Sequence, residues 1–305
     1  MARSIPGFRF MAYRRVAMVV SALLLVGSMA SLAVRGLNFG IDFTGGTLVE
    51  VRYSVPGDVG DVRNALLDGG FADATAQHFG DASDVLVRLP ASDTGDLGVR
   101  VLQALRAAAA EGETVDLRRE EFVGPQVGDE LAEDGALAMI WALGGILVYI
   151  AFRFRWQFAL GAIAALVHDT IITVGFFSVT RLPFDLTVLA ALLAVIGYSL
   201  NDTIVIFDRI RETFLRRRKG TVMELIDRSL NETLSRTLVT GVTTLLVLVA
   251  LLVVGGEVIR GFAIALILGV VIGTYSSLYI ASPVLSMLGL TREDMLEGEK
   301  EQAVP

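Results

Sequence analysis

Four ionisable side chains lie inside long apolar runs of this sequence. Asp202 follows Asn201 in "GYSLNDTIVIF", Arg236 lies in "NETLSRTLVTG", and His168 and Asp169 are adjacent in "ALVHDTIIT". A charged group in a membrane interior costs several kcal/mol unless it is hydrated, paired or turned toward other protein groups. These residues therefore mark a candidate site for moving protons.

Asp202 and Arg236 belong to consecutive apolar runs, so we expect them at a similar depth, where an ion pair between them is geometrically reasonable. A neighbouring positive charge favours an ionised carboxylate, whereas burial favours a protonated one. A carboxylate that switches between these states as helices move can carry protons across a membrane. The alternative is a static pair that only fixes helix packing, and Arg236 could also pair with Glu232.

Further polar side chains accompany these groups. Tyr198 and Ser199 precede Asp202 by one helical turn, and a threonine stripe follows the run that carries Arg236. His168 titrates near neutral pH and could relay a proton toward Asp202, or it could form a plain interhelical hydrogen bond. The candidates for a proton relay or for polar helix contacts are His168, Asp169, Asn201, Tyr198, Ser199 and Thr240.

Six apolar runs provide the elements that would position these groups. The 305 residues are 53% hydrophobic, and the mean hydropathy of +0.62 exceeds that of an average soluble domain. A helix needs about 20 mostly apolar residues to cross a bilayer. The sequence therefore predicts an α-helical polytopic membrane protein with the spans Val16–Val34, Gly135–Phe152, Phe158–Val179, Leu186–Phe207, Leu234–Val254 and Gly261–Ser282.

Lysine and arginine in the short loops predict the orientation of the spans. They are concentrated before the first span, after the second and after the fourth, whereas the short loops of the other side hold only Arg181 and Arg260. We expect both termini in the cytoplasm and the segment between the first two spans in the periplasm. Cleavage of the first span as a signal peptide after "SMA" would leave five spans, so we expect the span to be retained.

The segment 38–134 has the pattern of a small soluble domain. It holds 19 acidic residues against seven basic ones, and its runs predict the order βαββαβ of a ferredoxin-like α+β domain. The strands are expected in "TLVEVRY", "ATAQHF", "DVLVRLP" and "TVDLRREEFVG", and the helices in "DVRNALLDGG" and "GVRVLQALRAAAA". In "GIDFTGG" before the first strand, Phe43, Gly45 and Gly46 are predicted to form a hinge.

The predicted organisation has five parts. They are a cytoplasmic N-terminal tail (1–15), the first span (16–34), the periplasmic domain (38–134), a five-helix block (135–282) with an amphipathic cytoplasmic loop (208–233), and a cytoplasmic C-terminal tail (283–305). The basic amphipathic loop would suit a helix on the cytoplasmic membrane face near anionic lipid, or a solvated connector.

Other classes of function receive no support from the sequence. The chain has no cysteine, which excludes disulfides and thiolate metal sites. We find no nucleophile elbow, no P-loop and no metal-ligand cluster, and no basic nucleic-acid footprint. We therefore expect neither an enzyme nor a bound cofactor or metal.

Five segments, in order along essentially the whole chain, resemble the SecD/SecF family of protein-export membrane proteins, in particular its SecF members. They are "GIDFTGG", "FVGPQVGDEL", "VHD", "GYSLNDTIVIFDRIRE" and "NETLSRTLVTG". The resemblance implies a relation to the resistance-nodulation-division transporters, a bacterial inner-membrane location and a heterodimer with SecD. It further implies cooperation with the SecYEG channel and the SecA motor, in which the proton-motive force promotes translocation of unfolded preprotein.

In that family an aspartate and an arginine linked to proton conduction match Asp202 and Arg236. Two alternatives remain beside this hypothesis. A small-molecule exporter of the same superfamily would need a much larger outward domain with a substrate cleft. A purely structural assembly subunit would use Asp202 and Arg236 only to pack helices.

Overall fold

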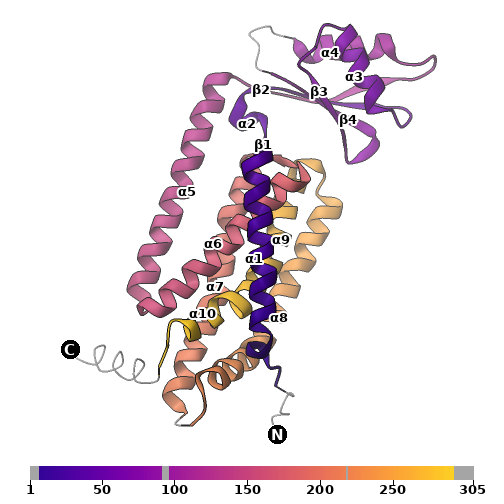
Figure 1. Cartoon of the computed structure of the whole chain (residues 1–305). Coiled ribbons are helices and arrows are strands. Elements are labelled where there is room, and N and C mark those ends of the chain that lie inside the picture. The colour runs from indigo at the N-terminus through magenta and orange to yellow at the C-terminus, as the bar shows by residue number, and fades with distance from the viewer. Residues whose placement is uncertain (1–6, 91–95, 218, 292–305) are drawn as a thin grey trace.

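The protein combines a helical bundle with an α+β domain at one end of it (Figure 1). The structure is a computed structural model that describes residues 7–90, 96–217 and 219–291. Within these residues, six helical segments are long and apolar enough to cross a membrane, which confirms the six predicted spans. They are α1 (Phe10–Arg35), α5 (Pro125–Arg153), α6 (Trp156–Thr180), α7 (Leu186–Arg216), α8 (Val222–Val254) and the segment Arg260–Met287.

The last of these segments is not one regular helix. It consists of α9 (Arg260–Ser276), a π-helical turn at Ser277–Ala281 and α10 (Ser282–Met287). Helical structure therefore extends into both predicted tails, since α1 begins at Phe10 and α10 reaches Met287. The outer parts of those tails, 1–6 and 292–305, lie outside the described residues.

Helix α7 lies at the centre of the bundle and packs against α6, α8 and α9, while α1 packs on α6. Helix α5 stands at the side of the bundle (Figure 1), and only 6% of its most apolar stretch is buried by the rest of the chain. The corresponding fraction is 56% for α6 and 44% for α7. Most of α5 is thus left for contact with lipid or with another chain.

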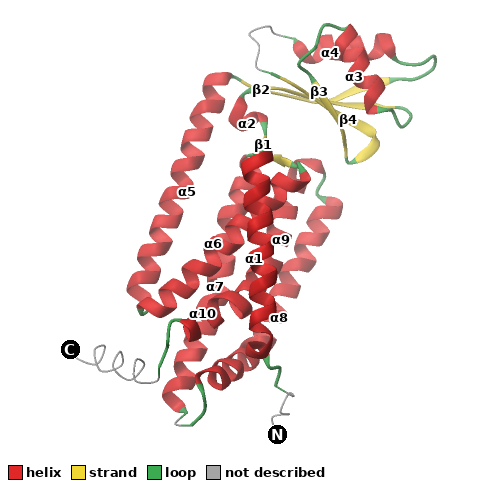
Figure 2. Cartoon of the chain, viewed as in Figure 1, coloured by secondary structure: helices red, strands yellow, loops and turns green. Residues whose placement is uncertain are grey.

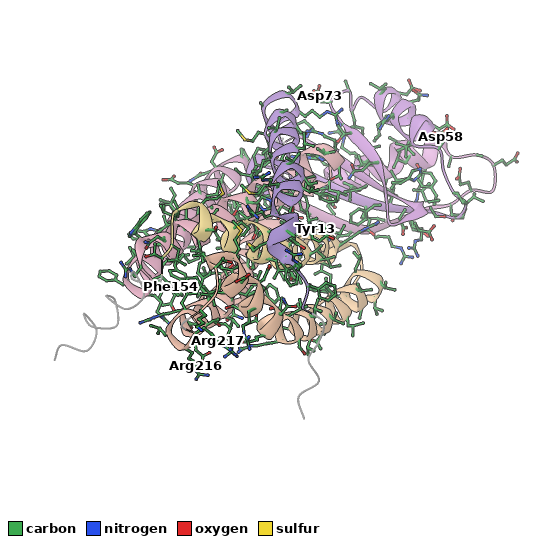
Figure 3. The ribbon with its side chains drawn as sticks, turned by 60° about the horizontal axis from the view of Figure 1, so that its bottom comes forward. Tyr13, Asp58, Asp73, Phe154, Arg216 and Arg217 are labelled. Atoms are coloured by element: carbon green, nitrogen blue, oxygen red, sulfur yellow. The ribbon has the colours of Figure 1, made fainter. Side chains whose placement is uncertain are left out.

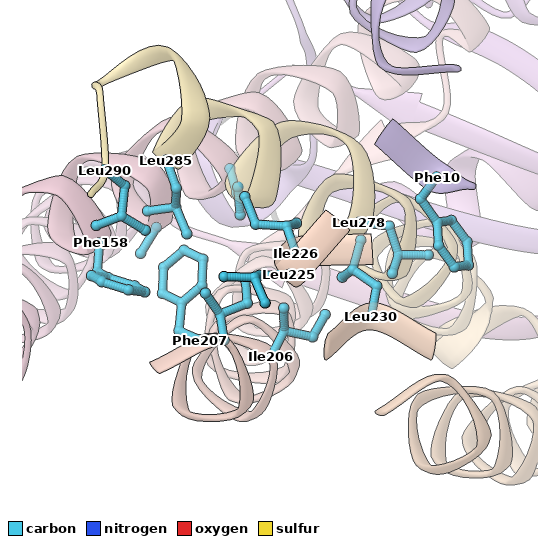
Figure 4. Packing of buried hydrophobic residues seen from close by; sticks show 14 of the residues in the cluster. Phe10, Phe158, Ile206, Phe207, Leu225, Ile226, Leu230, Leu278, Leu285 and Leu290 are labelled. Carbon is cyan, nitrogen blue, oxygen red and sulfur yellow. The ribbon is translucent and has the colours of Figure 1, made fainter. Parts of the chain in front are cut away.

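A hydrophobic core closes the bundle at the end away from the α+β domain (Figure 4). The rings of Phe158 and Phe207 pack edge to face at 5.1 Å, and Leu225, Ile226 and Leu230 of α8 are buried beside them. The segment 208–233, predicted as an amphipathic loop, is in fact the end of α7 and the start of α8 around a short connection. Its apolar side chains pack on the protein core, so they are not available to lie in lipid.

Helix α8 holds the start of α1. Helix α1 has no side-chain cap of its own, but the Asp227 carboxylate accepts a hydrogen bond from the Met11 backbone N–H at 2.8 Å. The Asn231 side chain exchanges two hydrogen bonds of 2.8 Å with the backbone of Phe8. A carboxylate at a helix N-terminus also complements the helix dipole.

The α+β domain has the predicted order βαββαβ. Its elements are β2 (Gly46–Tyr53), α3 (Val59–Asp68), β3 (Thr75–Phe79), β4 (Asp81–Leu89), α4 (Leu97–Ala108) and β5 (Val115–Val123). The antiparallel sheet has the order β3-β4-β2-β5, with α3 and α4 on one face (Figure 2). Val49 and Val51 of β2 point into the core against these helices, and the alternate residues point to the other face.

A short parallel strand pair that the sequence did not predict ties this domain to the bundle. Strand β1 (Asn38–Phe39), after the end of α1, pairs with β6 (Pro183–Phe184), which lies between α6 and α7. Helix α2 (Ile41–Thr44) follows β1, and the Asp42 carboxylate accepts a hydrogen bond from the Leu186 backbone N–H at 3.0 Å.

The two connections of the α+β domain touch each other through their backbones. Gly45 has φ +64°, and a Cβ on it would lie 3.0 Å from the Cα of Pro125; a Cβ on Gly128 would lie 2.7 Å from the Gly45 nitrogen. Glycine is therefore required where the chain enters and leaves the domain. A hinge at Phe43, Gly45 and Gly46 stays a prediction. The backbone contact explains the need for glycine at Gly45 and Gly128 without a hinge.

The charged ends of the molecule are opposite each other. Figure 3 shows Arg216 and Arg217 at the end away from the α+β domain. The α+β domain itself carries Asp58 and Asp73. At the same end as Arg216, Arg153 at the close of α5 forms a 2.8 Å ion pair with Asp208 of α7.

The contact between the two connections predicts that Gly128→Ala destabilises the protein, although alanine is the better helix former. Overpacking against backbone costs about 1–3 kcal/mol, so the thermal unfolding midpoint in detergent should fall by several degrees. Gly144→Ala is the matched control, because a Cβ at this position of α5 meets nothing within 4 Å. Equal midpoints for the two variants would contradict the proposed contact.

The sheet of the α+β domain contains an ion pair that predicts a pH dependence. Arg52 Nε donates to Asp84 at 2.5 Å, and the guanidinium lowers the pKa of this nearly buried carboxyl. A depressed pKa stabilises the fold above the unfolded-state pKa, about 3.9, and this contribution is lost as pH falls through the folded-state pKa. Hydrogen exchange of β2 and β4 in the full chain, corrected for intrinsic rates, should show this loss.

Asp84→Asn should expose β2 and β4 to exchange already at neutral pH and flatten the acid dependence. Asp116→Asn is the control, because the 3.4 Å pair of Asp116 with Arg106 is largely exposed and should contribute little. The same acid profile in wild type and Asp84→Asn would rule out the assigned role of this pair.

Candidate functional site

Asp202 lies on α7 where this helix faces α8. Thr237 of α8 donates a hydrogen bond to Asp202 Oδ1 at 2.7 Å. The other carboxylate oxygen, Oδ2, is buried and has no hydrogen-bond partner among the described residues. The hydrogen bonding of this carboxylate is therefore incomplete. The side chain as a whole is only half-buried, so part of it remains exposed outside the packed bundle.

The expected ion pair between Asp202 and Arg236 is not formed in the structure. Arg236 is exposed, and its helical neighbour Thr237 is the residue that meets Asp202. Successive residues of a helix differ by about 100° in direction, so only one of the two can face α7.

Both carboxylate oxygens of Asp169 on α6 are hydrogen-bonded inside the bundle. Its Oδ2 accepts hydrogen bonds from Ser199 of α7 at 2.5 Å and from Ser276 of α9 at 2.7 Å. Its Oδ1 lies 2.8 Å from Nδ1 of His168. Asp169 is 1% exposed, so three helices supply the donors that replace water around it.

His168 extends this network toward α1. With Nδ1 donating to Asp169, Nε2 remains, and it has no hydrogen-bond partner among the described residues. The imidazole stacks on the ring of Tyr275, with 6.1 Å between the ring centroids. The Tyr275 hydroxyl donates to the Ala17 carbonyl at 2.7 Å and lies 3.0 Å from the Ser21 hydroxyl.

The two carboxylate sites are one turn apart on α7. Ser199 belongs to the Asp169 network, and Asp202 follows it by three residues. The adjacent Thr203 forms a 2.8 Å hydrogen bond with Ser277, the first residue of the π-helical turn. π-helical turns often occur at functional sites. This one begins next to Ser276, which donates a hydrogen bond to Asp169.

The structure separates the remaining predicted residues from these networks. Asn201 is exposed, and Tyr198 is half-buried without a hydrogen bond from its side chain to any described residue. Thr240 is exposed and donates to the Arg236 carbonyl of its own helix at 2.8 Å. Of the predicted threonine stripe, Thr237 is thus the member that bonds to another helix.

Sequence reasoning missed the contribution of α9. Tyr275, Ser276 and Ser277 are three consecutive polar residues inside the last apolar run, separated from Gly273 by Thr274. A Cβ on Gly273 would lie 3.0 Å from the Ser199 Cβ, so this glycine lets α9 approach α7 closely. The run "GTYSS" was the signal that could have revealed these residues.

Chemically, the site offers three side chains that can bind a proton, namely Asp169, His168 and Asp202, in a region of low dielectric. Within the described residues, no group of three or more histidine, cysteine or acidic side chains is arranged to hold a metal ion. The arrangement is therefore suited to proton binding coupled to contacts between helices.

Comparison with models of protein families gives two matches. Residues 103–291 match the family described as protein export membrane protein SecD/SecF, C-terminal, and residues 30–56 match the SecD/SecF GG motif. The second match contains Gly45 and Gly46, where the two connections of the α+β domain meet.

Several curated proteins are similar over nearly their whole length. The chain is 54% identical over 295 residues to the protein translocase subunit SecF of Pseudomonas aeruginosa, which covers 97% of this chain and 96% of the relative. It is 49% identical to SecF of Vibrio alginolyticus, covering 96% and 93% of the two chains. It is 44% identical to SecF of Escherichia coli O157:H7, covering 97% and 92%.

Two solved structures share the fold. The crystal structure of SecDF, a translocon-associated membrane protein from Thermus thermophilus, matches 95% of this chain with a TM-score of 0.84 and 38% identity. A crystal structure of SecDF in a super-membrane-facing form matches 98% with a TM-score of 0.70 and 37% identity. This chain spans only 40% and 41% of the length of those SecDF chains.

The Asp169 network predicts that Ser199→Ala and Ser276→Ala each destabilise the bundle. Removing one donor from a buried acceptor costs about 1–3 kcal/mol, which should lower the thermal unfolding midpoint in detergent by several degrees. The control is Thr173→Val on α6, since the buried Thr173 hydroxyl has no partner among the described residues. This variant should be neutral or stabilising; if it were as damaging as Ser276→Ala, the hydrogen bonds to Asp169 would not explain the loss.

Proposed function

The chain belongs to the SecD/SecF family of protein-export membrane proteins, and we propose that it is a SecF subunit that works with SecD to promote preprotein translocation at the expense of the proton-motive force. It is a multi-pass protein of the bacterial inner membrane. The likeness to SecF subunits and to the solved SecDF chains supports SecD as the partner. The SecYEG channel, the SecA motor and unfolded preprotein complete the proposed machinery.

In the proposed orientation both termini are cytoplasmic and the ferredoxin-like domain is periplasmic. The support is the charge distribution, because the basic residues at the ends of α5 and α7 lie opposite the acidic α+β domain (Figure 3). Basic loops are retained on the cytoplasmic side of inner-membrane proteins. The domain would then meet preprotein as it emerges from the channel.

The observation that carries the proposal is the incomplete hydrogen bonding of Asp202. One of its oxygens is bonded to Thr237 of the neighbouring helix and the other has no partner among the described residues. Asp169, in contrast, has both oxygens occupied by donors. We therefore assign the transported proton to Asp202 and helix packing to Asp169, while His168 is a candidate relay through its open Nε2.

Proton binding at Asp202 would change the force between α7 and α8. An ionised Asp202 attracts the Arg236 guanidinium and accepts from Thr237; a protonated one has lost its charge and can itself donate a hydrogen bond. Each proton that crosses a potential of 100 mV releases about 2.3 kcal/mol, which shifts a two-state equilibrium roughly 50-fold. A shift of this size would turn two equally populated arrangements of α7 and α8 into a strong preference for one of them.

The test is proton flux and preprotein export in proteoliposomes that contain this chain, its SecD partner, SecYEG and SecA. Asp202→Asn and Arg236→Met should reduce both activities on the order of tenfold or more. The first variant removes the group that exchanges the proton, and the second removes the charge that attracts the ionised Asp202. An uncompensated charge at this depth of the membrane costs several kcal/mol. Thr240→Val is the control, since Thr240 is exposed and bonds only to its own helix. It should retain both activities.

Co-purification with SecD and an unchanged unfolding midpoint establish that each variant is assembled. Wild-type flux and export in assembled Asp202→Asn would overturn the proposal and leave a structural role for this carboxylate. Loss of export with intact flux would separate proton transport from protein export.

A further inference from the structure

An apolar pocket of about 410 Å³ lies between the first part of α5 and the strand pair β1–β6. One of its walls is aromatic. The rings of Phe39 and Phe43 are 5.8 Å apart, Phe43 stacks on Phe184 at 6.3 Å, and Phe39 meets Phe184 edge to face at 6.2 Å. Phe39 is nevertheless 44% exposed, so this wall presents a large ring that the chain itself does not cover.

The opposite wall is a face of α5 built from small side chains. Ala132, Gly135 and Ala136 line the pocket together with Met139, at the spacing of a single helical face. A Cβ on Gly135 would lie 2.8 Å from a methyl of Leu189 on α7. The helices are therefore in contact at Gly135, and the small alanines beside it leave the pocket open.

The pocket lies where the apolar part of the bundle begins, on the side of the α+β domain. The acidic residues of α5 end at Asp134 and its apolar run starts at Gly135, while α7 starts at Leu186, just before Leu189. This level corresponds to the membrane leaflet next to the α+β domain. Since only 6% of the most apolar stretch of α5 is buried, the pocket is continuous with a helix surface that lipid surrounds.

The charges beside the pocket favour one type of headgroup. Asp129 and Glu133 are exposed and lie within one turn of Ala132, and α5 has no lysine or arginine before Arg153. Arg88 is not among the residues that line the pocket, and its guanidinium donates to the Phe39 carbonyl and the Thr44 hydroxyl. An acidic rim attracts an ammonium group and repels a headgroup with net negative charge.

We propose that this pocket binds an acyl chain of a phospholipid whose headgroup carries an ammonium, such as phosphatidylethanolamine, in the leaflet next to the α+β domain. The volume is within the range of small-ligand pockets, about 300–1,000 Å³, and aromatic rings offer a large apolar area to methylene groups. The bound chain inserts between Phe43 and α5, beside the contact of Gly45 with Gly128. The lipid thereby becomes part of the junction that carries the α+β domain.

The test is photolabelling of the full chain in bilayers of equal phosphatidylethanolamine and phosphatidylglycerol, with a diazirine on the acyl chain of only one of the two lipids. Mapping by mass spectrometry should find adducts concentrated on Phe43, Met139 and Leu189. The ethanolamine lipid should label them roughly two- to fivefold more than the glycerol lipid, as expected for surface charge interactions. Asp129→Asn combined with Glu133→Gln should remove this preference and keep the labelling.

Two further variants test the pocket itself. Ala136→Trp fills it and should reduce labelling of Phe43 and Met139 roughly fivefold or more, because overpacking opposes insertion. Ala138→Trp makes the same change on an exposed side of α5 that does not line the pocket, and it should leave the labelling unchanged.

Labelling spread evenly along α5, or equal loss in both tryptophan variants, would overturn the proposal in favour of unspecific lipid contact. Equal labelling by the two lipids would overturn the headgroup assignment. Loss of labelling when the SecD partner is present would overturn the proposal that a lipid occupies the pocket, because a protein surface would then be the occupant.

Discussion

Asp169 can remain in the middle of the bundle only because three helices bring donors to it. In a membrane there is no water to replace a missing hydrogen bond, so the positions of Ser199, Ser276 and His168 are fixed relative to one another by a single carboxylate. This constraint sets the close approach of α9 to α7 at Gly273. The arrangement of α6, α7 and α9 thus depends on one buried carboxyl group whose two oxygens are both hydrogen-bonded.

Helix α8 meets α7 in two different ways. Near the end of α7, Arg209 pairs with Glu232 of α8. In the apolar part of the bundle, the side-chain hydrogen bond between the two helices that the described residues show joins Thr237 to Asp202, and the second oxygen of that carboxylate has no partner. In the proposed mechanism, Asp169 keeps its contacts while those of Asp202 change with its proton. Helix movement is assigned to Asp202 because fewer hydrogen bonds must break there than at Asp169.

The sequence predicted those features that depend on local pattern. Apolar length identified the six spans, and alternation and helical spacing identified every element from β2 to β5. The same cost argument that singled out Asp202 and Asp169 led to two hydrogen-bond networks. Features that depend on how segments meet were not predictable in this way. Which of Arg236 and Thr237 faces α7 depends on helix rotation, and the β1–β6 pair joins residues about 145 positions apart.

The segment 208–233 shows a second limit of prediction from sequence. Its amphipathic pattern was identified correctly, but a pattern does not tell whether protein or lipid covers the apolar face, and here Leu225 and Ile226 are covered by protein. The small residues of α5 pose the same problem. Ala132 and Ala136 look like ordinary helix-packing positions in the sequence, and only the aromatic wall opposite them turns their face into a pocket.

The attachment of α1 to α8 has a consequence for biosynthesis. Phe8 and Met11 leave the ribosome long before their partners Asn231 and Asp227, which follow 223 and 216 residues later. At about 5–20 residues per second, translation of that interval takes roughly 10–40 s. Until α6 has been made, the first helix must hold its place in the bilayer by hydrophobicity and by its flanking arginines. Helix α6 then packs on it, and the start of the first helix is secured only when the fifth span has been made.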